Sequence, residues 1–170
     1  DNVVTIKNTV KDAQSISIKG ITGIRTLSAN PSEADDILSG KHILIVDDEK
    51  SIRETICDIV LKYGCIADTA HDGREAIALI NQCDYNLIIS DIKLPHATGY
   101  DIFAAARQKR PDRPVILMTG FGYDPNHSIV RSNRQGLSAV LYKPFKVDQL
   151  IAEIRKAIQN PNPYNIPNNS

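Results

Sequence analysis

Acidic residues follow short apolar runs of this chain at two points. Asp47 and Asp48 come directly after the run 42–46, and Asp91 comes directly after the run 86–90. Carboxylates gathered at one place raise one another's pKa unless a cation offsets their charge. A hard divalent ion is the natural offset, and Mg²⁺ takes one or two carboxylates together with water and phosphate oxygens. These residue types therefore predict a magnesium site that also attracts a phosphate.

Two further apolar runs lead into residues that complement such a site. Thr119 and Gly120 follow the run 114–118, and Lys143 lies just beyond the run 138–141. A hydroxyl and an ammonium can each donate a hydrogen bond to a phosphoryl oxygen. Each residue alone is more often a turn, cap or solvated surface residue. The residues that follow four of the five runs nevertheless supply the complementary groups of one phosphoryl-transfer site. Helix capping would not explain why all four positions carry such groups, so phosphoryl transfer is favoured.

The apolar runs are the elements that must position these side chains. Five runs of strand length alternate with segments of helical period between Lys41 and Gln159: 42–46, 65–69, 86–90, 114–118 and 138–141. The first, third and fourth runs lack polar alternation, which is typical of strands covered on both faces. Short connections between strands and helices give right-handed crossovers and a parallel sheet. The predicted fold class is doubly wound α/β, in which ligands bind beyond the carboxyl ends of the strands.

Composition excludes several classes of protein. The chain has 170 residues, 42% of them apolar, with 20 basic and 20 acidic residues, which indicates one globular domain with some chain left over. Its longest apolar runs have four or five residues, whereas a membrane span needs about 20, so no membrane insertion of this segment is expected. Zero net charge removes the general attraction to nucleic acid, and no direct nucleic-acid binding is expected. One basic cluster is expected to complement a helix C-terminus: Arg107, Lys109, Arg110 and Arg113.

Cysteine and histidine residues are interpreted as structural or solvated. Cys57, Cys65 and Cys83 are odd in number and scattered, which argues against a disulfide framework or a zinc knuckle and fits a reducing cytoplasm. His71 is interpreted as a turn residue and His96 as a neutral loop residue. None of these residues is assigned to the site.

The two ends of the chain differ from the middle in composition and in hydrophobic pattern. Residues 1–40 are interpreted as an N-terminal extension, a linker or the remnant of a preceding domain. Residues 41–159 form the predicted folded domain, and residues 160–170 are an Asn- and Pro-rich tail expected to be disordered. Because the chain does not begin with Met, it is expected to be an excerpt of a longer protein.

Four motifs in order resemble the receiver domain of two-component response regulators. They are Ile45-Val46-Asp47-Asp48-Glu49, Asp91-Ile92-Lys93-Leu94-Pro95-His96-Ala97-Thr98-Gly99, Met118-Thr119-Gly120 and Lys143-Pro144-Phe145. The resemblance covers Lys41 to Gln159. It implies a flavodoxin-like, five-stranded parallel sheet of order 2-1-3-4-5 with helices on both faces. A hybrid sensor kinase that ends in such a domain is one expected source.

The resemblance also implies the metal ligands. Asp91 would be the phosphoacceptor, which takes a phosphoryl group from a phosphohistidine. Asp48, Asp91 and the backbone carbonyl of Lys93 would bind Mg²⁺, or Mn²⁺ as a substitute, and Asp47 would act through water. Phosphoryl transfer asks a protein mainly for alignment and charge stabilisation, and this arrangement would supply both.

The phosphate ligands follow from the same resemblance. The backbone N–H groups of Lys93 and Gly120 would cradle the phosphoryl group, and Thr119 and Lys143 would bind it with their side chains. The Lys143-Pro144 bond is similar to the cis peptide of the family and would aim the ammonium inward.

A conformational switch is implied as well. Thr119 would move toward the phosphoryl group, and the residue three positions before Lys143 would move with it. That switch residue is Val140 here, where the family has an aromatic, and Tyr142 is expected to point to the opposite face by strand alternation. Asp124 and Pro125 are interpreted as the N-cap and first turn of a polar fourth helix that phosphorylation shifts. The face formed by this helix, the fifth strand and the last helix is a candidate for homodimerisation.

The expected partner is a histidine kinase or a histidine phosphotransfer protein. The chain is expected not to be an enzyme, because it would assist only its own Mg²⁺-dependent phosphorylation and dephosphorylation. A phosphatase of the haloacid dehalogenase type needs a second Asp where this chain has Lys93. A flavodoxin is disfavoured because the acidic run after the first strand would repel a flavin phosphate. The alternative that stays open is a receiver-like interaction module that is not phosphorylated and has no Mg²⁺ affinity.

Overall fold

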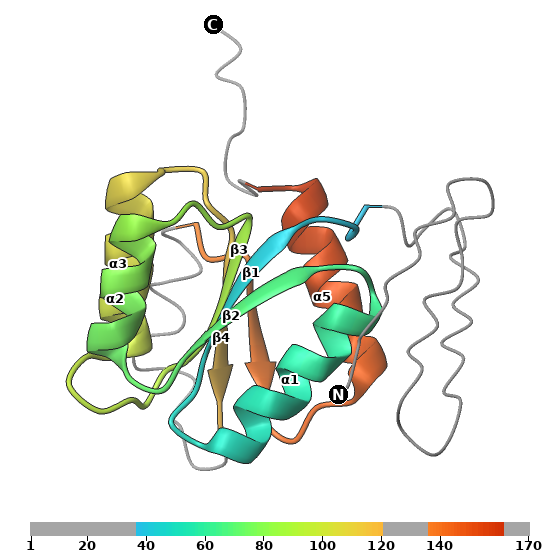
Figure 1. Ribbon diagram of the computed structural model, residues 1–170, viewed down its shortest axis with the longest axis horizontal. Coiled ribbons are helices and arrows are strands. Elements are labelled where there is room, and N and C mark those ends of the chain that lie inside the picture. The colour runs from blue at the N-terminus through green and yellow to red at the C-terminus, as the bar shows by residue number, and fades with distance from the viewer. Residues whose placement is uncertain (1–36, 121–135, 162–170) are drawn as a thin grey trace, which may run out of the picture. The chain divides into compact units, whose positions relative to one another are not determined.

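The computed structural model describes residues 37–120 and 136–161 (Figure 1). Strands and helices alternate along them, in the order β1 (His42–Val46), α1 (Lys50–Lys62), β2 (Ile66–Ala70), α2 (Gly73–Gln82), β3 (Leu87–Asp91), α3 (Gly99–Lys109), β4 (Val115–Thr119), β5 (Ala139–Tyr142) and α5 (Val147–Gln159). The predicted fourth helix with Asp124 and Pro125 lies outside the described residues. Within them, no helix has the length and hydropathy that a membrane span requires.

The five strands form one parallel sheet of order β2-β1-β3-β4-β5. This order confirms the predicted flavodoxin-like, doubly wound α/β fold. The first run has the predicted bounds, and each of the other four strands begins one residue later than its run. The five carboxyl ends therefore meet at one edge of the sheet, as the site prediction requires.

Two apolar cores cover the two faces of the sheet. On one face α1 and α5 pack over the sheet, and their core includes Ile43, Ile56 and Ile154. On the other face α2 and α3 pack over the sheet, and their core includes Leu44 and Ile102 (Figure 1). Strands β3 and β4 are buried along their whole length, which explains why their runs lack polar alternation.

The packed core begins ahead of Lys41, the start expected from the sequence. Leu38 is fully buried in the core on the α1 and α5 face, and Ile37 packs against it. The thiol of Cys65 donates to the Leu38 carbonyl at 3.3 Å. Gly40 donates its N–H to the carbonyl of Gly64, which follows α1. These contacts make residues 37–40 part of the folded unit.

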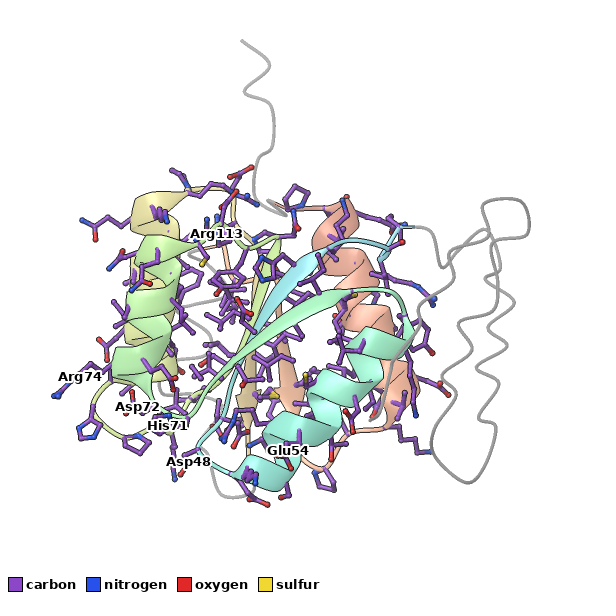
Figure 2. All side chains as sticks on the ribbon, in the orientation of Figure 1. Asp48, Glu54, His71, Asp72, Arg74 and Arg113 are labelled. Atoms are coloured by element: carbon purple, nitrogen blue, oxygen red, sulfur yellow. The ribbon has the colours of Figure 1, made fainter. Side chains whose placement is uncertain are left out.

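The basic cluster is more than a complement to a helix end. Arg107 and Lys109 do lie in the last turn of α3, but Arg113 lies beyond the helix, is fully buried and pairs with Asp84. Lys109 donates instead to three carbonyls at the end of α2, those of Ile80, Asn81 and Cys83. The prediction that Arg113 complements a helix C-terminus was wrong, because Arg113 lies beyond the end of α3 and is buried among other side chains (Figure 2).

Candidate functional site

The three predicted carboxylates meet at the carboxyl edge of the sheet. Asp47 follows β1, Asp91 is the last residue of β3, and Asp48 adjoins Asp47 in the chain. Each offers one oxygen, and these oxygens lie within 4.8 Å of one another. Asp47 is fully buried, Asp91 is 9% exposed, and Asp48 is exposed. We call this group the acidic pocket.

Lys143 reaches the acidic pocket from the end of β5. Its Nζ lies 2.6 Å from Asp47 Oδ2 and 2.6 Å from Asp91 Oδ2. Its backbone N–H donates to the Thr119 carbonyl at 2.7 Å, which fixes the start of the loop beside β4. The peptide bond between Lys143 and Pro144 is cis, as expected. One ammonium therefore bridges two carboxylates from different strands.

Burial and pairing set the charges of this site. Burial raises the pKa of Asp47, although the hydrogen bonds from Lys143 and from the Glu49 N–H oppose that rise. Burial would lower the pKa of Lys143, but its hydrogen bonds to Asp47 and Asp91 outweigh burial and raise that pKa. Lys143 is therefore a cation at neutral pH, and it offsets the negative charge of the acidic pocket.

Backbone groups hold the phosphoacceptor candidate in place. The N–H of Lys93 donates to Asp91 Oδ1 at 2.9 Å. Gly99 begins α3 against β3, and a Cβ at Gly99 would lie 2.6 Å from the Asp91 carbonyl oxygen. Arg53 on α1 donates to the Asp47 carbonyl at 2.6 Å. Sequence reasoning missed Arg53, because only folding brings α1 against the end of β1.

Of the remaining predicted site residues, Thr119 and Gly120 lie at the same edge, whereas Val140 lies within β5. Thr119 is buried at the end of β4, and Gly120 follows it at an exposed position. Val140 is half-buried and packs against the core on the α2 and α3 face. Tyr142 is 55% exposed. Because Leu141 between them belongs to the opposite core, Tyr142 shares the face of Val140, and the prediction that it points to the opposite face was wrong.

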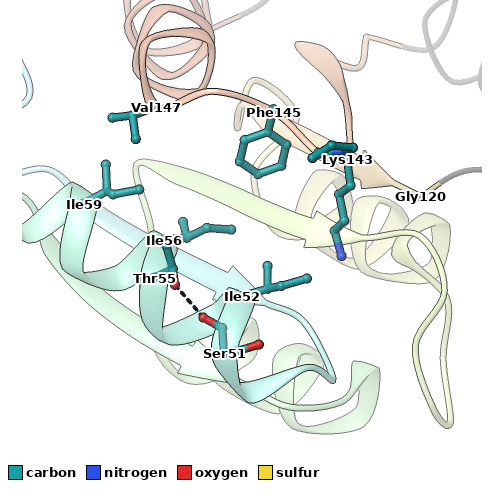
Figure 3. A pocket seen from close by; sticks show the side chains of 10 residues that line it. Ser51, Ile52, Thr55, Ile56, Ile59, Gly120, Lys143, Phe145 and Val147 are labelled. Carbon is teal, nitrogen blue, oxygen red and sulfur yellow. Dashed lines mark hydrogen bonds between the residues drawn. The ribbon is translucent and has the colours of Figure 1, made fainter.

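Two hollows adjoin the acidic pocket. One is a groove of about 440 Å³ between α1 and the start of α5, beside Lys143 and Gly120 (Figure 3). Its walls are mostly apolar and include Ile52, Ile59 and Phe145. The other, of about 490 Å³, is lined by the loop after β3 and by Asp48. The first hollow therefore adjoins Lys143, and the second adjoins Asp48 and Lys93.

The donor set of the acidic pocket fits Mg²⁺. Its members are three carboxylates, and hard oxygen ligands are those that Mg²⁺ prefers. Their oxygens are close enough to share one ion, and Asp48 faces the second hollow, where water can complete the coordination. The arrangement can therefore hold a divalent cation beside a nucleophilic carboxylate and an ammonium.

Comparisons with known proteins agree with this geometry. The family described as "Response regulator receiver domain" matches residues 43–155. The transcriptional regulatory protein TcrA of Mycobacterium tuberculosis is 31% identical over 74% of this chain and 49% of its own length. The transcriptional regulatory protein CusR of Escherichia coli is 32% identical over 69% of this chain and 51% of its own length. The chain thus spans about half the length of these two relatives.

Solved structures give the same result. A CheY-like receiver domain protein from Methanospirillum hungatei superposes with a TM-score of 0.67 at 31% identity, over 72% of this chain and 97% of its own. The chemotaxis response regulator CheY4 of Vibrio cholerae superposes with a TM-score of 0.63 at 28% identity, over 69% of this chain and 98% of its own. The likeness therefore extends over nearly all of both solved chains.

Proposed function

This chain belongs to the response regulator receiver domain family, and from that premise we propose that it accepts a phosphoryl group on Asp91. The observation that carries the proposal is the position of Asp91. It ends the central strand β3, within 2.6 Å of the Lys143 ammonium and within hydrogen-bond distance of the Lys93 N–H. A carboxylate held between an ammonium and a backbone donor is aligned for in-line attack on phosphorus.

The transfer exchanges one bond to phosphorus for another. A carboxylate oxygen of Asp91 attacks the phosphorus of a phosphohistidine and the P–N bond breaks. The electron pair of that bond goes to the departing ring nitrogen, and the imidazole leaves neutral because its other nitrogen carries a proton. Lys143 donates to the phosphoryl oxygens as negative charge spreads over them, and the N–H groups of Lys93 and Gly120 orient the group. Thr119 supplies a hydroxyl at the end of β4. Asp48, Asp91 and the Lys93 carbonyl would hold Mg²⁺, or Mn²⁺, with Asp47 acting through water, and the ion supplies charge neutralisation when bound.

The donor is a histidine kinase or a histidine phosphotransfer protein, and the chain's own part is limited to assisting the gain and loss of its phosphoryl group. The apolar groove supports docking of such a protein, because a helix seated there would lie beside Lys143, which contacts Asp91. The acyl phosphate adds nearly two negative charges at the end of β3. We propose that Thr119 and Val140 transmit this change to the face around β5, on which homodimerisation would be regulated.

The test is labelling with a small phosphodonor. The full chain is incubated with acetyl phosphate and Mg²⁺, and intact mass spectrometry counts the phosphoryl groups gained. We expect one group in the unchanged chain, none in Asp91→Asn, and one in Asp58→Asn, which removes an exposed carboxylate of α1. A folded chain that gains no group in the presence of Mg²⁺ would instead support the non-phosphorylated interaction module.

A further inference from the structure

Asp48 differs from the other two members of the acidic pocket in what holds it. Both oxygens of Asp47 accept hydrogen bonds, one from a backbone N–H at 2.9 Å and one from Lys143 at 2.6 Å. Asp91 is held in the same way, by the N–H of Lys93 and by Lys143. In the part of the chain that the structure describes, no hydrogen bond or ion pair holds the exposed Asp48 carboxylate. The direction of this carboxylate therefore depends on the backbone that carries it.

Arg53 holds the peptide unit that leads into Asp48. Its Nη1 donates to the Asp47 carbonyl at 2.6 Å. That carbonyl belongs to the peptide bond between Asp47 and Asp48, and the six atoms of a peptide unit lie in one plane. A guanidinium that holds the carbonyl oxygen therefore also restrains the N–H and the Cα of Asp48. Because the side chain leaves from this Cα, Arg53 influences the direction of the carboxylate through the backbone.

The position of Arg53 is itself fixed by the start of α1. Its N–H donates to the carbonyl of Glu49, the N-cap residue of the helix, at 3.1 Å. The Glu49 carboxylate accepts the hydroxyl of Ser51 at 2.8 Å. Arg53 is half-buried, and a hydrogen bond from a charged donor is stronger than one between neutral groups. The guanidinium therefore joins the start of α1 firmly to the end of β1.

The turn between β1 and α1 has few other attachments at this point. Asp48 lies in this turn (Figure 2). The N–H of Asp47 donates to the Ala70 carbonyl at 3.2 Å, but that N–H belongs to the peptide unit before Asp47. For the peptide unit after Asp47, Arg53 is the side chain that the described residues supply. Loss of its guanidinium would therefore free the segment that carries the Asp48 carboxylate.

The charge of Arg53 has an effect of opposite sign on a bound cation. The acidic pocket holds three carboxylates, and Lys143 already lies against two of them. A second cation nearby repels a divalent ion, so charge alone predicts tighter Mg²⁺ binding once Arg53 is removed. Positioning predicts weaker binding, because loss of an outer group that orients a metal ligand typically lowers affinity roughly 10- to 100-fold. The direction of the change in affinity therefore distinguishes the two effects.

We propose that Arg53 is a positioning residue for Asp48 as a metal ligand, and that its positioning effect outweighs its charge. The inference rests on the proposed function in one respect, namely that the acidic pocket binds Mg²⁺. An exposed carboxylate loses conformational freedom when it binds an ion, and a backbone that is already oriented reduces that loss. Arginine suits this role, because its planar guanidinium loses less freedom for each hydrogen bond that it forms.

The test measures metal affinity in the unphosphorylated full chain. Mn²⁺ is titrated into the chain, electron paramagnetic resonance counts the free ion, and competition with Mg²⁺ gives the Mg²⁺ affinity. We expect Arg53→Met to weaken binding of both ions about tenfold. Arg53→Lys keeps the charge and a donor, and it should restore most of the affinity. Lys50→Met is the matched control, because Lys50 is an exposed cation of the same helix that pairs with Glu54 at 3.6 Å, and it should not weaken binding.

A second readout separates positioning from a general loss of stability. Urea unfolding without metal shows that each variant is folded, and Arg53→Gln replaces Arg53→Met if the latter is not. The Mg²⁺ concentration for half-maximal labelling by acetyl phosphate should rise about tenfold in the neutral variant, in line with its affinity. A variant that had lost only stability would be labelled with an unchanged half-maximal concentration.

The outcomes distinguish this inference from the proposed function. Equal or tighter metal binding in a folded Arg53→Met or Arg53→Gln would overturn the assignment of Arg53. Phosphoryl acceptance by Asp91 would stand in that case, provided that the unchanged chain binds Mg²⁺ and is labelled. An unchanged chain that binds neither Mn²⁺ nor Mg²⁺ would overturn both the inference and the proposed function.

Discussion

Lys143 carries more of the candidate site than any other single residue. It bridges the buried Asp47 and the phosphoacceptor candidate Asp91 through two contacts of equal length. Both carboxylates come from neighbouring central strands, so one side chain balances charge that two strands bring together. At the scale of single residues, the sequence predicts this arrangement well. The aspartates at two strand ends show that negative charge must be balanced there, and the lysine after a third strand supplies the balancing cation.

Other single residues could not be predicted, because their environment exists only in the folded chain. Cys65 is buried, and nothing in the sequence shows that its thiol donates to the Leu38 carbonyl. His71 and His96 are 25 positions apart and carry no motif. Their approach to Asp72 depends on the close contact of two loops.

Burial of Cys65 predicts a loss of stability at alkaline pH. Burial raises the pKa of its thiol from 9.0 to about 11. The unfolded chain loses this proton above pH 9 while the folded chain keeps it. The contribution of the buried thiol to the free energy of unfolding is therefore complete below pH 9. It is lost as pH rises through about 11, for a total of about 2 to 3 kcal/mol at 1.4 kcal/mol per pH unit.

Urea unfolding between pH 8 and pH 10.5 measures this effect. The free energy of unfolding of the unchanged chain should fall toward that of Cys65→Ala as pH rises. The cavity and the lost hydrogen bond in Cys65→Ala give an offset that does not vary with pH. Parallel curves for the two proteins would show that the thiol ionises equally in both states.

At the scale of elements, the approach of α3 to β3 is the feature on which the site depends. α3 begins at Gly99 and is capped by Thr98, whose hydroxyl accepts the Asp101 N–H while the Asp101 carboxylate accepts the Thr98 N–H. The cap fixes where the helix starts, and the missing Cβ of Gly99 lets that start touch the Asp91 backbone. The sequence cannot show which backbone atoms the start of the helix must clear.

Gly99→Ala should therefore move the start of α3 away from β3, the strand that ends in Asp91. The added Cβ would lie 2.6 Å from the Asp91 carbonyl oxygen and 3.0 Å from Ile92 Cα, so the helix must move away. We expect a cost of about 1 to 3 kcal/mol in the free energy of unfolding, as for other overpacked sites. Phosphoryl labelling of Asp91 should slow as well.

Urea unfolding and timed intact-mass labelling measure the two effects of this substitution. Ala104→Ser, at an exposed position of the same helix, is the control and should change neither value appreciably. If Gly99→Ala proved as stable and as readily labelled as Ala104→Ser, the close approach would have no part in holding Asp91.

At the scale of the whole molecule, the sheet order and its two covered faces follow from the sequence because apolar runs and helical periods are strong signals. The bounds of β2, β3, β4 and β5 were displaced by one residue, since a run marks apolar positions and not hydrogen-bonded ones. The packing of Ile37 and Leu38, ahead of the first strand, carried no such signal. Arg113 was misjudged for the same reason, because charge alone does not show which arginine is enclosed.

The enclosed Arg113 joins two parts of the molecule that are distant in sequence. It lies before β4 and pairs with Asp84, which lies between α2 and β3. Within residues 37–120 and 136–161, its Nε and one terminal nitrogen have no hydrogen-bond partner. Asp84→Asn should cost about 1 to 3 kcal/mol in the free energy of unfolding, because it leaves a buried charge unpaired. Arg113→Met should cost less, since it removes both the charge and the unpaired donors.

Urea unfolding of both variants gives the comparison. Asp112→Asn is the control, because Asp112 pairs with Arg110 at the surface, and its effect should stay within about 0.5 kcal/mol. A larger loss in Arg113→Met than in Asp84→Asn would mean that the ion pair itself, and not the avoidance of an unpaired charge, holds these loops together.

The spacing of Asp47, Asp91 and Lys143 along the chain has a consequence for biosynthesis. Lys143 is 96 residues from Asp47 and 52 from Asp91. A ribosome delivers the acidic strand ends long before it delivers the cation that joins them. The bridge between Asp47 and Asp91 can therefore form only after β5 has been synthesised and has paired with β4.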